Sequence, residues 1–228
     1  MERRLIVNAD DFGWTCDVNR GILQARLEGV LRSTTLMANG AAFEDAARLA
    51  NEHPELDVGV HLTLVGGQAV ARASGEQLPG GVAQLIFGLS GRWSAAAIQE
   101  EFAAQIEKVQ SAGIRPTHLD THKHTHLLPP VLEALIAVGK RYSIPWVRRP
   151  FDLHVPEAQA RVSAGRRFAS RIMRARAAAL TRRLDVAGLR ATDHFAGFQM
   201  TGLYDAADLR TQGQRHDRRE EAARPVFE

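Results

Sequence analysis

The stretch Thr117-His-Leu-Asp-Thr-His-Lys-His-Thr-His126 carries four of the nine histidines in a chain of 228 residues. Its chemically active side chains occupy every second position: His118, Asp120, His122, His124 and His126. Because an extended strand sends alternate side chains to one face, this spacing would gather metal ligands and proton carriers on a single surface. Imidazoles packed together repel one another when protonated, so the crowding favours a chemical role over a structural one.

The segments around this stretch predict alternating strands and helices. Strands are expected at residues 5–7, 33–37, 57–64, 117–120 and 146–148, and helices at residues 17–28, 41–51, 94–111 and 130–141. Residues 65–92 are rich in glycine and predict a long loop. This alternation predicts an α/β fold with a parallel sheet, either barrelled or doubly wound, whose reactive groups lie at the carboxyl ends of the strands.

The composition is that of an ordinary globular protein, with 45% hydrophobic and 24% charged residues. A net charge of +3 is too weak to indicate nucleic acid as a partner. Cys16 is the sole cysteine, which excludes an intrachain disulfide and favours a reducing compartment. The first residues do not resemble a signal peptide, and no apolar run is long enough to span a membrane. We therefore expect a cytoplasmic protein.

Two more groups of candidate site residues lie near predicted strand ends. Asp10 and Asp11 follow the first strand, and His61 lies within the third. Adjacent carboxylates can simply form a turn or cap a helix, and a lone histidine in a strand can be a core residue. Together with the histidine stretch, however, they form an Asp/His set suited to a catalytic metal. The histidine stretch also allows metal storage or a pH-sensitive surface, and only one or two of its residues need bind a metal.

Two later segments have two interpretations each. Residues 161–183 contain eight arginines and no acidic residue, with an apolar stripe at Phe168, Ile172, Ala175 and Ala179. The segment is either a solvated helix or a surface for an anionic membrane or a phosphorylated ligand. Thr192-Asp-His-Phe-Ala-Gly-Phe-Gln-Met-Thr-Gly202 is either a loop that lines the site or an ordinary turn.

Three motifs together resemble the YdjC-like (ChbG/HpnK-type) carbohydrate deacetylases: Asn8-Ala-Asp-Asp-Phe-Gly13, Gly59-Val-His-Leu62 and Thr117-His-Leu-Asp-Thr-His122. The segment Thr192-Asp-His-Phe-Ala-Gly-Phe198 is similar to the branch associated with hopanoid biosynthesis. The resemblance implies a distorted, TIM-like (β/α) barrel that removes the acetyl group from an N-acetylated sugar with one divalent metal ion.

The resemblance also implies roles for individual residues. Asp11, His61 and His122 would bind the metal, and Asp10 would be the catalytic base. Side chains of the surrounding shell or of the substrate site would be His124, His126, Asp120 and His194. The ligand set suits zinc, nickel, cobalt or manganese, and the resemblance allows magnesium.

The C-terminal residues depart from the family, whose members usually continue further and carry a late His-Pro-Gly segment. Residues 211–228 contain eight charged residues and predict a solvated tail after a single domain at residues 1–210. His216 matches no family motif. We therefore expect a truncated or frameshifted chain with a barrel that is incomplete at its C-terminus.

These observations lead to one expected function and two alternatives. The expected function is deacetylation of an N-acetylated sugar, with a hopanoid glycolipid as one candidate substrate and the inner membrane surface as one candidate location. Peripheral membrane contact and a homodimer are compatible with it. The alternatives are another metallohydrolase of the phosphoesterase type and a catalytically inactive metal-binding homologue.

Overall fold

The computed structural model describes residues 5–71, 76–150, 163–193, 195 and 197. The strands are β1 (Asn8–Phe12), β2 (Ser33–Leu36), β3 (Asp57–Leu62), β4 (His118–Thr121), β5 (Trp146–Val147) and β6 (Arg190–Ala191). The helices are α1 (Cys16–Leu27), α2 (Phe43–Glu52), α3 (Val82–Gly88), α4 (Ala95–Ser111), α5 (Pro129–Arg141) and α6 (Ala164–Val186). A short 3₁₀ segment, His122–Leu127, connects β4 to α5.

The strands form one six-stranded sheet in the order β1-β2-β3-β4-β5-β6, and every neighbouring pair is parallel. In the wall of a (β/α) barrel, strands that follow one another in the sequence are neighbours in the sheet. In a doubly wound sheet, by contrast, the order of the strands reverses at one point. Since all strands run the same way, their carboxyl ends lie along one edge. The pairing of His61 with Asp120 places two predicted site residues side by side at that edge.

Most predicted elements are confirmed to within a few residues, but the first strand and the long loop differ. Strand β1 comprises Asn8–Phe12, while the apolar residues Leu5 and Ile6 before it are 88% and 58% exposed. Within the predicted loop, α3 forms at Val82–Gly88. The strand forms at residues 8–12, and not at the predicted apolar residues 5–7, because the polar side chains of β1 find partners in neighbouring strands. Local hydrophobicity does not reveal such partners.

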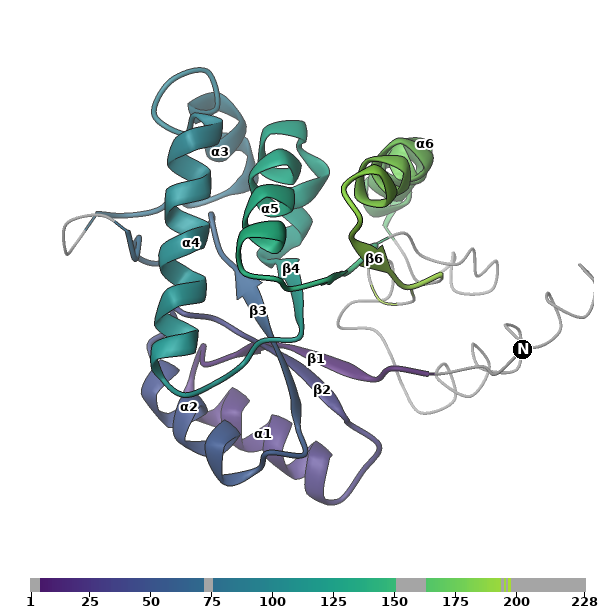
Figure 1. Cartoon of the computed structure of the whole chain (residues 1–228). Coiled ribbons are helices and arrows are strands. Elements are labelled where there is room, and N and C mark those ends of the chain that lie inside the picture. The colour runs from purple at the N-terminus through teal and green to yellow at the C-terminus, as the bar shows by residue number, and fades with distance from the viewer. Residues whose placement is uncertain (1–4, 72–75, 151–162, 194, 196, 198–228) are drawn as a thin grey trace, which may run out of the picture. The chain divides into compact units, whose positions relative to one another are not determined.

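Helices pack in pairs against the sheet, with α1 beside α2 and α4 beside α5 (Figure 1). The core between sheet and helices contains buried apolar side chains such as Leu119 of β4, Phe102 and Ile106 of α4 and Leu135 of α5. Ser94 caps α4, and its side chain accepts a hydrogen bond from the Ala97 N–H. None of the helices in the described residues is long and apolar enough to cross a membrane.

A buried polar pair on α4 fixes the chain that follows β3. The carboxylate of Glu101 accepts hydrogen bonds from the N–H groups of Val70 and Ala71 and from the Gln105 amide. Gln105 in turn bonds both the N–H and the carbonyl of Thr63. Because both side chains are fully buried, these bonds take the place of hydrogen bonds to water at the backbone groups within residues 63–71. They hold that segment against α4.

The chain divides into two compact units. The first, residues 1–148 and 182–191, contains the whole sheet. The described part of the second consists mainly of α6, in which Phe168 and Ile172 of the apolar stripe are 66% and 46% exposed. Residues 198–228, and with them the predicted tail at 211–228, lie outside the described residues, so the proposed domain boundary stays a prediction.

We expect Glu101→Gln to lower the free energy of unfolding by about 1–3 kcal/mol, because the NH2 group that replaces one carboxylate oxygen cannot accept a hydrogen bond from the buried N–H groups. Urea denaturation measures the change. Glu100→Gln, on the exposed side of the same helix turn, is the matched control and should leave stability within about 0.5 kcal/mol of the unmodified protein. Equal effects of the two substitutions would contradict the anchoring role.

Candidate functional site

A β-bulge in β1 directs two neighbouring carboxylates toward the same region. Ala9 pairs with Thr34 and Phe12 with Leu36, so Asp10 and Asp11 together lie opposite the single residue Thr35. Asp11 has a φ of 64°, a left-handed conformation that Asp tolerates better than most residues. In a regular strand these side chains would point to opposite faces, and the bulge removes that restriction. Both carboxylates consequently come within 4.8 Å of a His61 ring nitrogen.

Asp11, His61 and His122 form a compact triangle of ligand atoms. Asp11 Oδ1 lies 3.3 Å from His61 Nε2 and 3.0 Å from His122 Nδ1, and the two ring nitrogens are 3.2 Å apart. Tetrahedral coordination with bonds of about 2.1 Å would separate ligand atoms by about 3.4 Å. The three groups come from β1, from β3 and from the start of the 3₁₀ segment. Their spacing fits a single metal ion bound on one side of the triangle.

The charge of the surroundings also fits a divalent ion. Asp10, Asp11 and Asp120 contribute three negative charges near His61, and Arg148 contributes one positive charge. With neutral imidazoles the cluster therefore carries a net charge of −2. A divalent ion would neutralise it, and one carboxylate with two imidazoles is a set that zinc and related metals accept.

On the side of the ring that faces away from the triangle, Nδ1 of His61 lies next to a carboxylate and a hydroxyl. Its Nδ1 lies 2.6 Å from Asp120 Oδ1, and the Thr35 hydroxyl donates to the other oxygen of Asp120 over 3.3 Å. A carboxylate at this position favours a proton on Nδ1, which leaves the Nε2 lone pair directed at the triangle. Both His61 and Asp120 are buried, so the ring has a fixed orientation.

Arg148, directly after β5, links the carboxylates of β1 and β4. Its guanidinium donates to both oxygens of Asp10 over 2.6 Å and lies 2.8 Å from Asp120 Oδ2. A planar guanidinium is suited to such two-point contact with a carboxylate. Burial alone would lower the pKa of Arg148, but the charges of Asp120 and Asp10 raise it above its usual range. Arg148 therefore remains a permanent cation in the site.

The same contacts shift the pKa values of the triangle. Burial tends to raise the pKa of Asp11, but hydrogen bonds with His122 and His61 hold it well below its usual range. Burial likewise opposes the charged form of His61, yet the charge of Asp120 and a hydrogen bond with Asp11 raise its pKa to about 10. Without a metal ion, His61 is therefore an imidazolium with protons on both ring nitrogens at neutral pH, and metal binding must release the proton from Nε2.

The remaining histidines of the stretch do not share the triangle. The chain leaves the strand after Thr121, and Lys123 and His124 adopt φ values of 54° and 52°, so the alternating pattern ends there. His126 is buried with Nδ1 2.6 Å from the Thr121 hydroxyl, and its ring contacts that of His124. His118, at the start of β4, lies close to Gly59. His194 lies outside the described residues.

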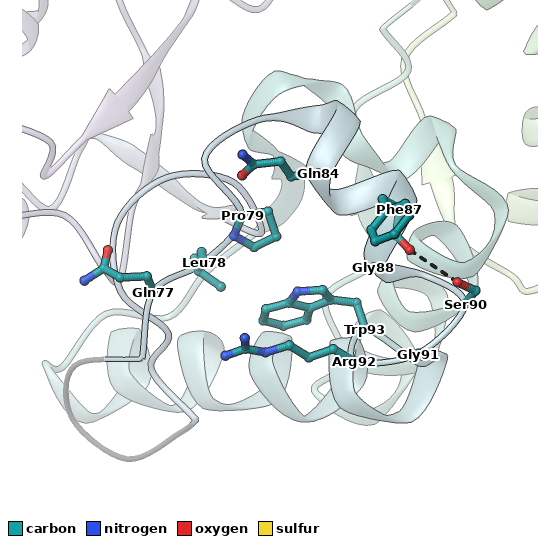
Figure 2. A pocket seen from close by; sticks show the side chains of 10 residues that line it. All are labelled: Gln77, Leu78, Pro79, Gln84, Phe87, Gly88, Ser90, Gly91, Arg92 and Trp93. Carbon is teal, nitrogen blue, oxygen red and sulfur yellow. Dashed lines mark hydrogen bonds between the residues drawn. The ribbon is translucent and has the colours of Figure 1, made fainter.

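Sequence reasoning missed Arg148 and Thr35. Arg148 is the last residue of the strand predicted at 146–148, and this position was the available signal. Thr35 has no signal of its own. The structure also contains a separate groove of about 520 Å³ along residues 77–93 (Figure 2). Its lining residues include Pro79, Phe87 and Trp93, and none belongs to the Asp/His cluster.

A parallel α/β sheet with an Asp/His cluster at the carboxyl ends of its strands places the candidate metal ligands at the edge where barrel-like scaffolds carry their sites. Residues 4–222 match the YdjC-like protein family, and the chain belongs to that family. The six-stranded parallel sheet is consistent with the distorted barrel of this family, so the predicted α/β fold class is confirmed.

Similar proteins include carbohydrate deacetylases. The chain is 44% identical over 151 residues to a carbohydrate deacetylase of Geobacillus stearothermophilus, with 64% of this chain and 59% of the relative covered. It is 40% identical to a chitooligosaccharide deacetylase of Klebsiella pneumoniae, with 63% and 58% covered. The chain thus spans about three-fifths of the length of these relatives.

A solved structure is similar as well. It is the crystal structure of an Enterococcus faecalis protein described as a candidate for cellobiose-phosphate cleavage. The TM-score is 0.54 at 31% sequence identity, with 63% of this chain and 57% of that chain covered.

Replacement of the carboxylate behind His61 should weaken metal binding. We expect Asp120→Asn to lower zinc affinity about 10- to 100-fold, because the amide orients His61 less firmly and makes its Nε2 a poorer ligand. Isothermal titration calorimetry of the metal-free protein measures the affinity. Asp57→Asn, at the opposite end of the β3–β4 pair, is the control. Unchanged affinity in Asp120→Asn would show that His61 does not bind the metal.

His126 should make the fold sensitive to acid. Burial lowers the pKa of His126 to about 3, against about 6.5 in the unfolded chain. Between these values the unfolded state binds more protons, so stability is complete above pH 6.5 and falls as the pH decreases. From pH 7 to pH 5 this group should cost about 2 kcal/mol, measured by urea denaturation. The His126→Gln variant should lose less stability than the unmodified protein between pH 7 and pH 5. If the unfolding free energies of the two proteins change in parallel with pH, His126 is not the group responsible.

Proposed function

We propose that the protein is a metal-dependent hydrolase that removes the acetyl group from an N-acetylated sugar. The observation that carries the proposal is the triangle of Asp11, His61 and His122 with the Asp10 carboxylate beside it at the carboxyl edge of the sheet. Names of similar proteins support the substrate class, since they include carbohydrate and chitooligosaccharide deacetylases.

Asp11, His61 and His122 would hold the metal ion. When bound, the metal supplies Lewis acidity, which polarises an amide carbonyl and makes water more acidic. The buried Asp120 and Thr35 keep His61 in the orientation that the site requires. Removal of a sugar N-acetyl group needs such an electrophile, because an amide carbonyl reacts slowly with water at neutral pH.

Asp10 is the base in this proposal, and its contacts select one oxygen. Oδ1 accepts hydrogen bonds from Arg148 and from the Asn8 amide, which occupy both of its lone pairs. Oδ2 accepts one bond from Arg148, so among the described residues it retains a lone pair for a proton taken from the attacking water. Arg148 holds the carboxylate in place while this proton is transferred.

For the substrate we propose an N-acetylglucosamine oligomer of the chitooligosaccharide kind. The hopanoid-associated branch, which stays a prediction from residues 192–198, makes an N-acetylglucosaminyl glycolipid the second substrate to assay. The basic, partly apolar surface of α6 supports contact with an anionic membrane if that glycolipid is the substrate. A phosphorylated disaccharide is the third substrate, suggested by the description of the Enterococcus faecalis protein.

Asp10→Asn should reduce acetate release from N,N′-diacetylchitobiose at least about 100-fold, because the amide cannot accept the proton. Zinc affinity, measured by calorimetry, should remain within a few-fold. Asp17→Asn, an exposed carboxylate on α1, is the control and should leave turnover unchanged. Turnover that survives in Asp10→Asn would exclude Asp10 as the base. Phosphate release from a phosphorylated disaccharide, without acetate release from diacetylchitobiose, would favour the phosphoesterase. Zinc binding with neither product would favour an inactive homologue.

A further inference from the structure

We propose that the indole ring of Trp14 is the platform on which the pyranose ring of the substrate stacks. The inference rests on the proposed sugar deacetylase function and adds to it a binding residue for the sugar itself. Three observations support it: the fixed position of Trp14, its contact with His122, and its exposed surface.

The backbone holds Trp14 next to the Asp/His cluster. The Trp14 N–H donates to the carbonyl of Asp11 over 3.0 Å, which closes a tight turn directly after that residue. Gly13 adopts a φ of 93°, and its N–H donates to the buried side chain of Asn19 over 2.7 Å. Thr15 then caps α1. A residue between a hydrogen-bonded turn and a capped helix loses little additional freedom when a ligand binds.

The Trp14 ring borders the triangle through His122. The ring centroids lie 5.6 Å apart, and the ring planes are perpendicular. This is a favourable arrangement for two aromatic rings, so it fixes the side chain as well as the backbone. Trp14 therefore stands directly beside an imidazole whose Nδ1 belongs to the triangle.

Almost half of the Trp14 side chain nevertheless remains open to water. Its exposed fraction is 48%, whereas Trp93 is buried at 2%. Trp146 is comparably exposed at 40%, but the guanidinium of Arg190 lies over its ring at 5.7 Å. Within the described residues, no Lys or Arg side chain lies over the Trp14 ring. A rigid, open aromatic surface beside a polar cluster is suited to a ligand that is apolar on one side and polar on the other.

A pyranose ring has this character. The C–H groups on its flat faces carry partial positive charge and match the electron-rich face of an indole, while its hydroxyl and acetamido groups point outward from the ring edge. A sugar stacked on Trp14 would lie beside the triangle, and an acetamido group at its edge could reach Asp10 and the metal ligands. Stacking would then position the sugar, and the polar cluster would act on the amide.

The test compares Trp14→Ala and Trp14→Phe with the unmodified protein, using N,N′-diacetylchitobiose as the probe. We expect Trp14→Ala to raise the KM for acetate release about tenfold while kcat changes less than about twofold. Trp14→Phe should restore most of the KM, since a phenyl face also stacks. Trp146→Phe is the control for loss of an exposed tryptophan and should match the unmodified protein. Zinc affinity should be the same in all four proteins.

Binding without turnover is measured in the Asp10→Asn background by tryptophan fluorescence. Diacetylchitobiose should change the emission when Trp14 is present, including in Trp146→Phe, and should leave it unchanged in Trp14→Phe. An unaltered KM in Trp14→Ala overturns the proposal. A defect in Trp14→Phe as large as that in Trp14→Ala, or a parallel loss of zinc affinity, also overturns it, because Trp14 would then only support His122.

The two proposals fail in different ways. If acetate is released and Trp14→Ala keeps the normal KM, the platform is wrong and the deacetylase function stands. If no acetylated sugar releases acetate but diacetylchitobiose changes the Trp14 emission, the sugar platform stands and the proposed reaction is wrong.

Discussion

The carboxylates of Asp10, Asp11 and Asp120 gather around the ring of His61, and their mutual repulsion would separate them if no cation opposed it. Arg148 provides that cation, with two short bonds to Asp10 and one to Asp120. Asp10 belongs to β1, Asp120 to β4, and Arg148 follows β5. One buried guanidinium thus connects strands that are distant in the sequence, and it holds Asp120, the carboxylate that contacts His61.

The chain departs from regular strand geometry at two places, around Asp11 and directly after His122. Asp11 adopts a positive φ within a bulge, and Lys123 and His124 adopt positive φ directly after His122. Such conformations cost about 1 kcal/mol or more for residues other than glycine. The contacts of Asp11 with two imidazoles compensate for this cost at the bulge. The departure from regular structure is therefore tied to the presentation of the ligands.

The carboxyl edge of the sheet combines features that suit a metal ion, a sugar ring and a stable fold. The cluster carries a negative charge that a divalent ion would neutralise, and the turn that follows Asp11 also presents Trp14. Residues 63–71 after β3 are held by Glu101 and Gln105, which fixes the chain next to His61. One edge of the sheet thus combines the candidate metal ligands with the exposed ring of Trp14, as the proposed deacetylation requires.

The sequence by itself determined the parallel α/β fold, because the alternation of apolar strands with capped helices is a local property of the chain. It also grouped Asp10, Asp11 and His61 with the histidine stretch, since the carboxyl ends of parallel strands must share one edge, and the family resemblance selected His122 from that stretch. Their roles as base and ligands stay predictions. Only the tertiary structure decided where the strands end: β1 includes the two aspartates, and β4 ends at Thr121, so His124 and His126 lie apart from the triangle. The contact of Arg148 with Asp10 was likewise decided there, because these charges, 138 positions apart in the sequence, meet only after the strands have packed.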